Sequence, residues 1–145
     1  MADNNHRTWH CVLVTPERAV MAEDVDFVAL PMYDGELGIL PGRAALIGRL
    51  GPGELRIRQG ETTKRCFVDG GFAQVRSDVV TVLTPRALKV EEIDVAAARA
   101  ALEASPGVAA TPEAQSARLK AQERARAQLR IAGRQSGGGP HDGAH

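Results

Sequence analysis

The first half of the chain consists of short apolar runs separated by turn residues at close, regular spacing. Residues 55–58 show the cleanest pattern, because Leu55 and Ile57 alternate with charged residues, as in a strand with one face in the core and the other in solvent. This spacing predicts a β-sandwich or barrel of about ten short antiparallel strands. The predicted strands include residues 8–14, 19–22, 25–31, 45–50, 55–58, 64–68, 72–76 and 79–84.

A glycine-rich stretch, Asp-Gly-Glu-Leu-Gly-Ile-Leu-Pro-Gly-Arg at residues 34–43, interrupts these strands. Glycine permits positive φ and proline fixes φ, so their concentration predicts a tight turn at the tip of a sheet. The apolar side chains of Leu37, Ile39 and Leu40 within the stretch are expected to point inward.

The pattern changes after Pro85, where β-branched residues give way to alanine, glutamate and arginine. This change predicts a boundary between a β-sandwich domain over residues 1–85 and an α-helical hairpin over residues 86–134. Asp94 is a favourable N-cap residue, and it predicts a first helix from residue 95 to about residue 104.

The second helix is predicted to begin at Thr111, with Pro112 at its first position. One side of it is a stripe of small side chains at spacings of three and four, which predicts weak docking because alanine buries little area. The stripe comprises Ala114, Ala117, Ala121, Ala125, Leu129 and Ala132. The opposite side is basic and is expected either to be a solvated face or to suit an acidic partner. Its basic residues are Arg118, Lys120, Arg124, Arg126, Arg130 and Arg134. The glycine-rich residues 135–145 are predicted to form a disordered tail.

Composition excludes several function classes. The 18 basic residues balance the 18 acidic ones, so no net field attracts nucleic acid. The N-terminal residues lack the order of a signal peptide and no apolar run is long enough to cross a bilayer, so we expect a soluble protein without direct membrane insertion. Cys11 and Cys66 lie in apolar runs, which predicts reduced core residues, and no histidine or cysteine spacing predicts a metal site. The aromatic residues expected in the core are Trp9, Phe27, Phe67 and Phe72.

No group of side chains has the spacing of a catalytic site. His10 lies on the first predicted strand, where a structural role is expected, and Asp24 and Asp26 are expected to be solvated charges. Gly35 and Gly38 do not lie between a strand and a helix, and the lysine of a phosphate-binding loop is missing. The residues therefore indicate no catalytic site, and no cofactor is expected.

Several motifs occur in the order and spacing of one known family. They are Val-Thr-Pro-Glu-Arg at residues 14–18, Val-Asp-Phe-Val at 25–28, the glycine-rich stretch at 34–42, Leu-Gly-Pro-Gly at 50–53, Gly-Gly-Phe at 70–72 and Val-Thr-Val-Leu at 80–83. On these residues the sequence resembles the epsilon subunit of bacterial F-type, proton-translocating ATP synthases. The resemblance implies a ten-stranded β-sandwich followed by a two-helix hairpin.

The resemblance also implies a function and a location. A protein of this family is a non-catalytic rotor subunit of the central stalk, bound to the gamma subunit and to the membrane c ring, and peripheral on the cytoplasmic side of the bacterial inner membrane. The family's c-ring contact falls on Glu36, with Gly38, Ile39 and Arg43 around it. Arg43 stands where the family commonly has histidine, and its fixed charge argues against a proton-sensitive role.

The resemblance further implies that the helical hairpin regulates the synthase. In the family, basic residues of the hairpin meet acidic loops of the catalytic alpha and beta subunits and inhibit ATP hydrolysis. The implied contact residues are Arg118, Lys120, Arg124, Arg126 and Arg130.

Two other hypotheses remain open at this point. One is a nucleotide-sensing ATP-binding module, because some family members bind ATP through an Asp-x-x-Arg motif at the start of the first helix. Here the matching residues are Asp94 and Arg99, and the arginine comes two positions late, which turns its side chain by about 200° and argues against tight binding. The other is an unrelated small β enzyme, which would need a cleft with perturbed titratable groups.

Overall fold

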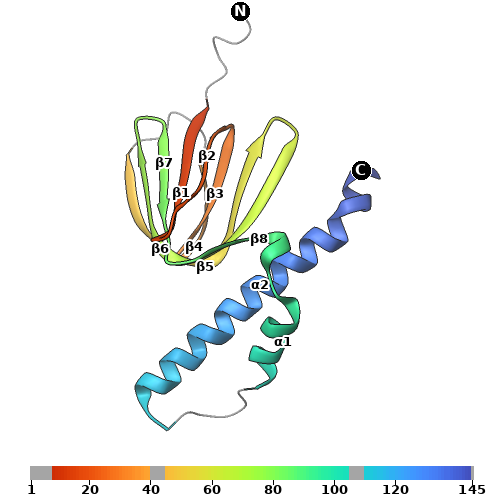
Figure 1. The fold of residues 1–145 in the computed structure, drawn as a ribbon. Coiled ribbons are helices and arrows are strands. Elements are labelled where there is room, and N and C mark those ends of the chain that lie inside the picture. The colour runs from red at the N-terminus through yellow and green to blue at the C-terminus, as the bar shows by residue number, and fades with distance from the viewer. Residues whose placement is uncertain (1–7, 40–44, 105–109, 145) are drawn as a thin grey trace, which may run out of the picture. The chain divides into compact units, whose positions relative to one another are not determined.

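A computed structural model describes residues 8–39, 45–104 and 110–144. The chain forms two units, Met1–Ala87 and Leu88–His145 (Figure 1). The first unit holds the strands β1 (Trp9–Val14), β2 (Ala19–Val25), β3 (Phe27–Met32), β4 (Gly35–Ile39), β5 (Leu46–Gln59), β6 (Thr62–Arg76) and β7 (Val79–Leu83). The chain keeps pairing beyond Pro85, because β8 (Ala87–Lys89) pairs with β6, and Asp69 N donates a hydrogen bond to Arg86 O at 3.0 Å.

The strands of the first unit follow the order β2-β1-β7-β6-β5-β3-β4. The sheet folds over, so that β2 approaches β5 and β6: Gln59 Nε2 donates to Asp24 O at 2.9 Å, and Lys64 Nζ lies 2.9 Å from Glu23 Oε1. The predicted β-sandwich is therefore confirmed. Two details differ, since the described ranges contain eight strands rather than ten, and β1 pairs with β7 in parallel.

The number of strands is lower because β5 and β6 each span two predicted strands. Gly51, Pro52 and Gly53 were expected to form a turn, yet β5 continues through them, with Pro52 opposite Asp69 in the β5–β6 register. On β6 the expected turn becomes a bend within the strand, where Gly71 has φ +109°. Long-range pairing thus overrides the local turn signal at both places.

The glycine-rich stretch is a hairpin arm rather than a loop alone. Its first half forms β4, which pairs antiparallel with β3. Leu37 is half-buried and Ile39 is buried, in agreement with the inward orientation that the sequence predicts. Leu40 and Arg43 lie outside the described residues.

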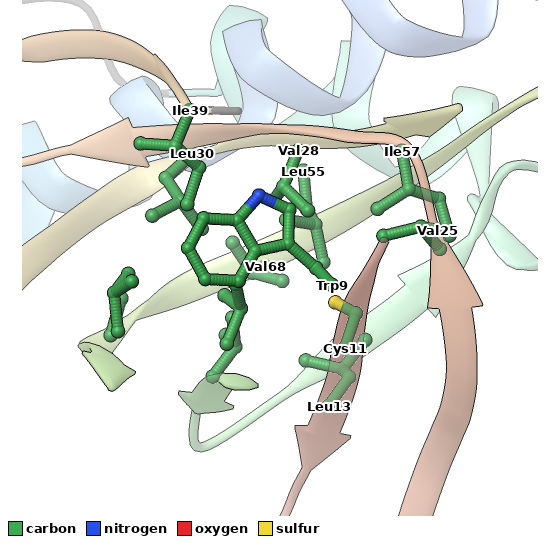
Figure 2. Close-up of a cluster of buried hydrophobic side chains, with 14 of the residues drawn as sticks. Trp9, Cys11, Leu13, Val25, Val28, Leu30, Ile39, Leu55, Ile57 and Val68 are labelled. Atoms are coloured by element: carbon green, nitrogen blue, oxygen red, sulfur yellow. The ribbon is translucent and has the colours of Figure 1, made fainter. Parts of the chain in front are cut away.

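The core of the first unit surrounds Trp9, whose side chain is fully buried. Figure 2 draws it in one cluster with Leu30 from β3 and Val68 from β6. Trp9, Cys11 and Leu13 alternate with more exposed residues along β1, so the period of two in the sequence correctly identifies the inner face of this strand.

The two cysteines are free thiols, as predicted, and Cys11 is buried whereas Cys66 is half-buried. Burial raises the pKa of the Cys11 thiol to about 12, and the charge of Glu23 adds to the shift. Cys11 is therefore a neutral core residue at physiological pH. His10 points outward on the same strand, where its Nδ1 lies 2.9 Å from Asp24 Oδ1.

The second unit contains a 3₁₀ turn, η2 (Val90–Glu92), and the helices α1 (Val95–Glu103) and α2 (Pro112–Ala144). Asp94 caps α1 as predicted, because its Oδ1 accepts a hydrogen bond from Ala97 N at 2.9 Å. At the start of α2, Thr111 Oγ1 accepts one from Ala114 N at 3.1 Å. The buried apolar residues of the unit are Ile93, Ala98, Ala125, Ala127 and Ile131.

The structure of α2 adds one detail to the sequence analysis and differs from it in another. Only part of the small-residue stripe is covered, since Ala125 is buried but Ala114 and Ala117 are exposed. The backbone also remains helical through residues 135–144, where a disordered tail was expected. Extending an existing helix needs no new nucleus, and this allows the helix to continue into a sequence of poor helix propensity.

Among the described residues, no helix is long and apolar enough to cross a bilayer. The same ranges contain no cluster of three His, Cys, Asp or Glu side chains that could hold a metal ion.

Candidate interaction surfaces

The predicted c-ring residues divide between the surface and the core. Glu36 stands on β4 with 51% of its side chain exposed, and Gly38 is exposed two residues further along. A Cβ at Gly38 would lie 2.9 Å from Phe27 Cζ, so this glycine lets the Phe27 ring lie against β4. Ile39 belongs to the core, and Arg43 lies outside the described residues. Among the described residues of this group, Glu36 is therefore the charge that β4 offers to a partner.

Glu36 is the first member of a line of alternating charges across the sandwich. Arg56 Nη1 on β5 lies 3.5 Å from Glu36 Oε2 and 3.8 Å from Glu54 Oε1. Arg65 Nε on β6 lies 3.3 Å from Glu54 Oε2. We call these four residues the charge line.

The alternation of side chains along β5 was predicted correctly, but the exposure of its charged residues was not. Glu54 and Arg56 were expected on a solvent-exposed face, yet only 8% of Glu54 is exposed and Arg56 is half-buried. Arg58 on the same face is exposed and stacks over the Phe27 ring at 5.1 Å. A single strand cannot reveal which neighbours will cover its charged side chains.

A second surface consists of large apolar side chains that remain in solvent. Its members are Tyr33, Ile47, Phe72 and Leu83, which we call the apolar surface. Phe72 was expected in the core but is 55% exposed. It lies opposite Leu83 on β7 and opposite Arg49 on β5, so these three side chains form one row on the same side of the sheet.

Arg49 extends this row toward the β3–β4 hairpin. Tyr33 N donates to Arg49 O at 2.8 Å, and the Arg49 guanidinium stacks over the Tyr33 ring at 4.6 Å. Ile47 lies two residues from Arg49 on β5 and therefore faces the same way. Sequence reasoning missed this surface, because the sequence of an alternating strand does not show which of its two faces the rest of the protein will cover.

The predicted basic residues of α2 occupy more than one side of the helix. Lys120, Arg126 and Arg130 are exposed, whereas Arg118 and Arg124 are half-buried. At about 100° per residue, the latter two lie within about 80° of the middle of the small-residue stripe, and the other three lie more than about 110° away. The helix thus presents three of its five predicted contact residues fully to solvent.

The two residues predicted for nucleotide binding are both exposed at α1. The Asp94 carboxylate is engaged as the cap of α1, and Arg99 is an exposed side chain further along that helix. The cap engages one of the two Asp94 carboxylate oxygens.

The chain is similar to a known family and to individual relatives over much of its length. The family model of the ATP synthase delta/epsilon chain β-sandwich domain matches residues 8–90. The chain is 53% identical to the ATP synthase epsilon chain of Rhodopirellula baltica over 121 residues, which cover 83% of this chain and 94% of that relative. It is 48% identical to the ATP synthase epsilon chain of Pelotomaculum thermopropionicum over 95 residues, or 66% of this chain and 71% of that one.

Solved structures give a similar result. One match is a chain in the structure of the Euglena gracilis mitochondrial ATP synthase, which comprises OSCP, F1 and the c ring. The TM-score is 0.67 and the sequence identity is 26%, over 94% of this chain and 81% of that one. A chain in the central stalk and c ring of the Tetrahymena thermophila mitochondrial ATP synthase matches with a TM-score of 0.66 over 87% of this chain and 97% of that one. At 16% identity, the latter likeness shows the fold alone.

Proposed function

The chain belongs to the ATP synthase delta/epsilon chain family, and from that membership we propose that it is a rotor subunit that couples the c ring and gamma to the catalytic head. It is a non-catalytic subunit of the synthase. The match over residues 8–90 carries the proposal, because this range contains both Glu36 and the apolar surface. The two epsilon chains named above come from bacteria, so we place the protein at the cytoplasmic side of the bacterial inner membrane, held there by its partners.

We assign the apolar surface to the gamma subunit. Exposed apolar side chains in one row are costly to keep in water, and a partner that covers them gains free energy in proportion to the area buried. Phe72 and Leu83 supply that area, while Arg49 beside them suits a carboxylate of the partner. Co-purification of the full chain with gamma tests the assignment, and failure to bind gamma at micromolar concentration would contradict it.

We assign Glu36 to the c-ring contact. Its side chain is 51% exposed near the start of β4, and Gly38, two residues further along the same face, is exposed as well. A charge-assisted contact in a water-excluded interface is worth about 1 to 2 kcal/mol, so Glu36→Gln is expected to weaken binding of the gamma complex to purified c ring about tenfold. Glu61→Gln is the matched control, because Glu61 is an exposed acidic residue in the turn between β5 and β6. Equal effects of the two variants would argue against a specific contact.

We assign the second unit to the regulation of ATP hydrolysis by contact with the alpha and beta subunits. The support is chemical, since Lys120, Arg126 and Arg130 are exposed on α2 and would pair with acidic loops. A chain that stops after Val90 keeps all eight strands, including the β8 pairing, and is expected to bind gamma while raising the rate of ATP hydrolysis. The full chain with Arg126 and Arg130 both changed to alanine should raise the rate partly. Hydrolysis rates equal to that of the complex with the unmodified chain would refute the inhibitory role.

A nucleotide-sensing module is not favoured by any observation on the described residues. One oxygen of the Asp94 carboxylate accepts the hydrogen bond that caps α1, and replacing Asp94 by alanine would cost about 1 kcal/mol of helix stability. Equilibrium dialysis of ATP against the full chain separates the two hypotheses, because the rotor proposal expects no binding at micromolar ATP.

A further inference from the structure

The charge line depends on a side chain that crosses a strand. Arg56 on β5 lies opposite Ala29 on β3, and Ala29 lies opposite Gly38 on β4. Arg56 and Glu36 therefore belong to strands that are separated by β3, at about 10 Å for two strand spacings. Their side chains nevertheless approach to 3.5 Å, so the Arg56 side chain must extend over β3 toward β4.

A small residue on β3, Ala29, lies on the path that the Arg56 side chain takes. Ala29 faces outward, because its neighbours Val28 and Leu30 belong to the core cluster, yet it has no exposed surface. A long side chain lying across β3 accounts for this burial. On β4 the Phe27 ring lies against Gly38, so Ala29 is the small residue that leaves room for the arginine on its way to Glu36.

The Arg56 guanidinium is held from its other sides as well. Glu54 Oε1 lies 3.8 Å from Arg56 Nη1, and the Phe27 ring lies 6.0 Å from the guanidinium carbon. Glu54 in turn contacts Arg65 at 3.3 Å. The cation is thus anchored, whereas Glu36 at the end of the line is about half-exposed.

We propose that Arg56 is the positioning residue of Glu36, which fixes the direction in which β4 presents its carboxylate to the c ring. This inference rests on the proposed ring contact through Glu36. An isolated glutamate samples several rotamers, and binding must remove that freedom, so a carboxylate held in advance binds more tightly. Because Arg56 shares its charge with Glu54, Glu36 keeps part of its attraction for a cationic group of the partner.

The test is a double-mutant cycle in the full chain, bound to gamma, with detergent-solubilised c ring as the ligand and surface plasmon resonance as the readout. Arg56→Gln is expected to weaken ring binding about two- to fivefold when Glu36 is present. It should cause no further loss in the Glu36→Gln background, because a residue that acts through Glu36 has nothing left to position. Arg56→Lys keeps the charge, and it should recover part of the affinity.

The matched control is Arg58→Gln, which removes the same charge from the same strand and the same aromatic ring, one pleat further from Glu36. It should leave ring binding unchanged, and urea unfolding of each variant shows whether the sandwich remains folded. If Arg56→Gln weakens binding equally with and without Glu36, or no more than Arg58→Gln does, the positioning role is wrong while the ring contact stands. If Glu36→Gln itself has no effect, the ring contact fails and the positioning role fails with it.

Discussion

Replacing Phe72 with alanine tests the gamma assignment directly. The residue keeps 55% of its surface in solvent, and a phenylalanine can bury roughly 200 Å², so a partner that covers the ring removes about 110 Å² from water. At about 25 cal/mol per Å² this area is worth about 2 to 3 kcal/mol. Phe72→Ala is therefore expected to weaken gamma binding roughly 30- to 150-fold. The free energy of unfolding should fall by only about 0.5 to 1 kcal/mol, because the ring packs on the surface beside Leu83.

The assay is a titration of fluorescently labelled full chain with a synthase head assembly that contains gamma and lacks this subunit. Leu119→Ala is the control, because Leu119 is similarly exposed at 53% but belongs to α2 in the second unit and not to the strands that carry the apolar surface. Its affinity for the assembly should match that of the unmodified chain. If Phe72→Ala binds as tightly as the unmodified chain, or if both variants lose affinity equally, the apolar surface is not the gamma contact.

Two further predictions concern the stability of the sandwich. Gly71 has φ +109° and an added Cβ would meet Leu83 O, so Gly71→Ala should lower the free energy of unfolding in urea by more than about 3 kcal/mol. Gly60 has φ +60° with open space around it, so Gly60→Ala should lower it by only about 1 to 2 kcal/mol. Equal losses in the two variants would contradict the steric reasoning. The pKa of Cys11 rises from 9.0 to about 12 on folding, so folding stability should fall as pH increases from 9 to 12, by up to about 4 kcal/mol. Cys11→Ala should remove that part of the pH dependence. If folding stability still falls with pH at the same rate in this variant, the loss does not come from Cys11.

The fold was predictable from sequence to the extent that local pattern decides it. Alternation along β1 identified its buried face, and Asp94 identified the start of α1. The pattern failed at Pro52 and Gly71, because the same residues that form turns also allow bends within a long strand. Only the partner strand decides between the two outcomes, and pairing between distant segments leaves no mark in a single sequence.

The candidate site was likewise predictable only where neighbouring residues in the sequence form it. Glu36 was identified because it belongs to a contiguous motif, whereas Arg56 comes twenty residues later and meets it only across β3. Phe72 was expected in the core because composition favours burial of scarce aromatic residues, but its strand turns that position outward. Sequence therefore identified the contact residue of β4, and the structure was needed to find both the side chain that holds it and the apolar surface.

The lengths of the two helices bear on the regulatory proposal. The nine residues of α1 rise about 13 Å, whereas the 33 residues of α2 rise about 50 Å, so α1 can lie beside little more than a quarter of its partner within the second unit (Figure 1). Ala114 and Ala117 belong to the small-residue stripe of α2 but are exposed, so the part of the stripe that is buried ends before it reaches them. A helix surface that α1 cannot reach must be solvated or meet another partner. The basic residues that start at Arg118 suit either case, because charged side chains are well solvated in water and also pair with the acidic partner that we propose.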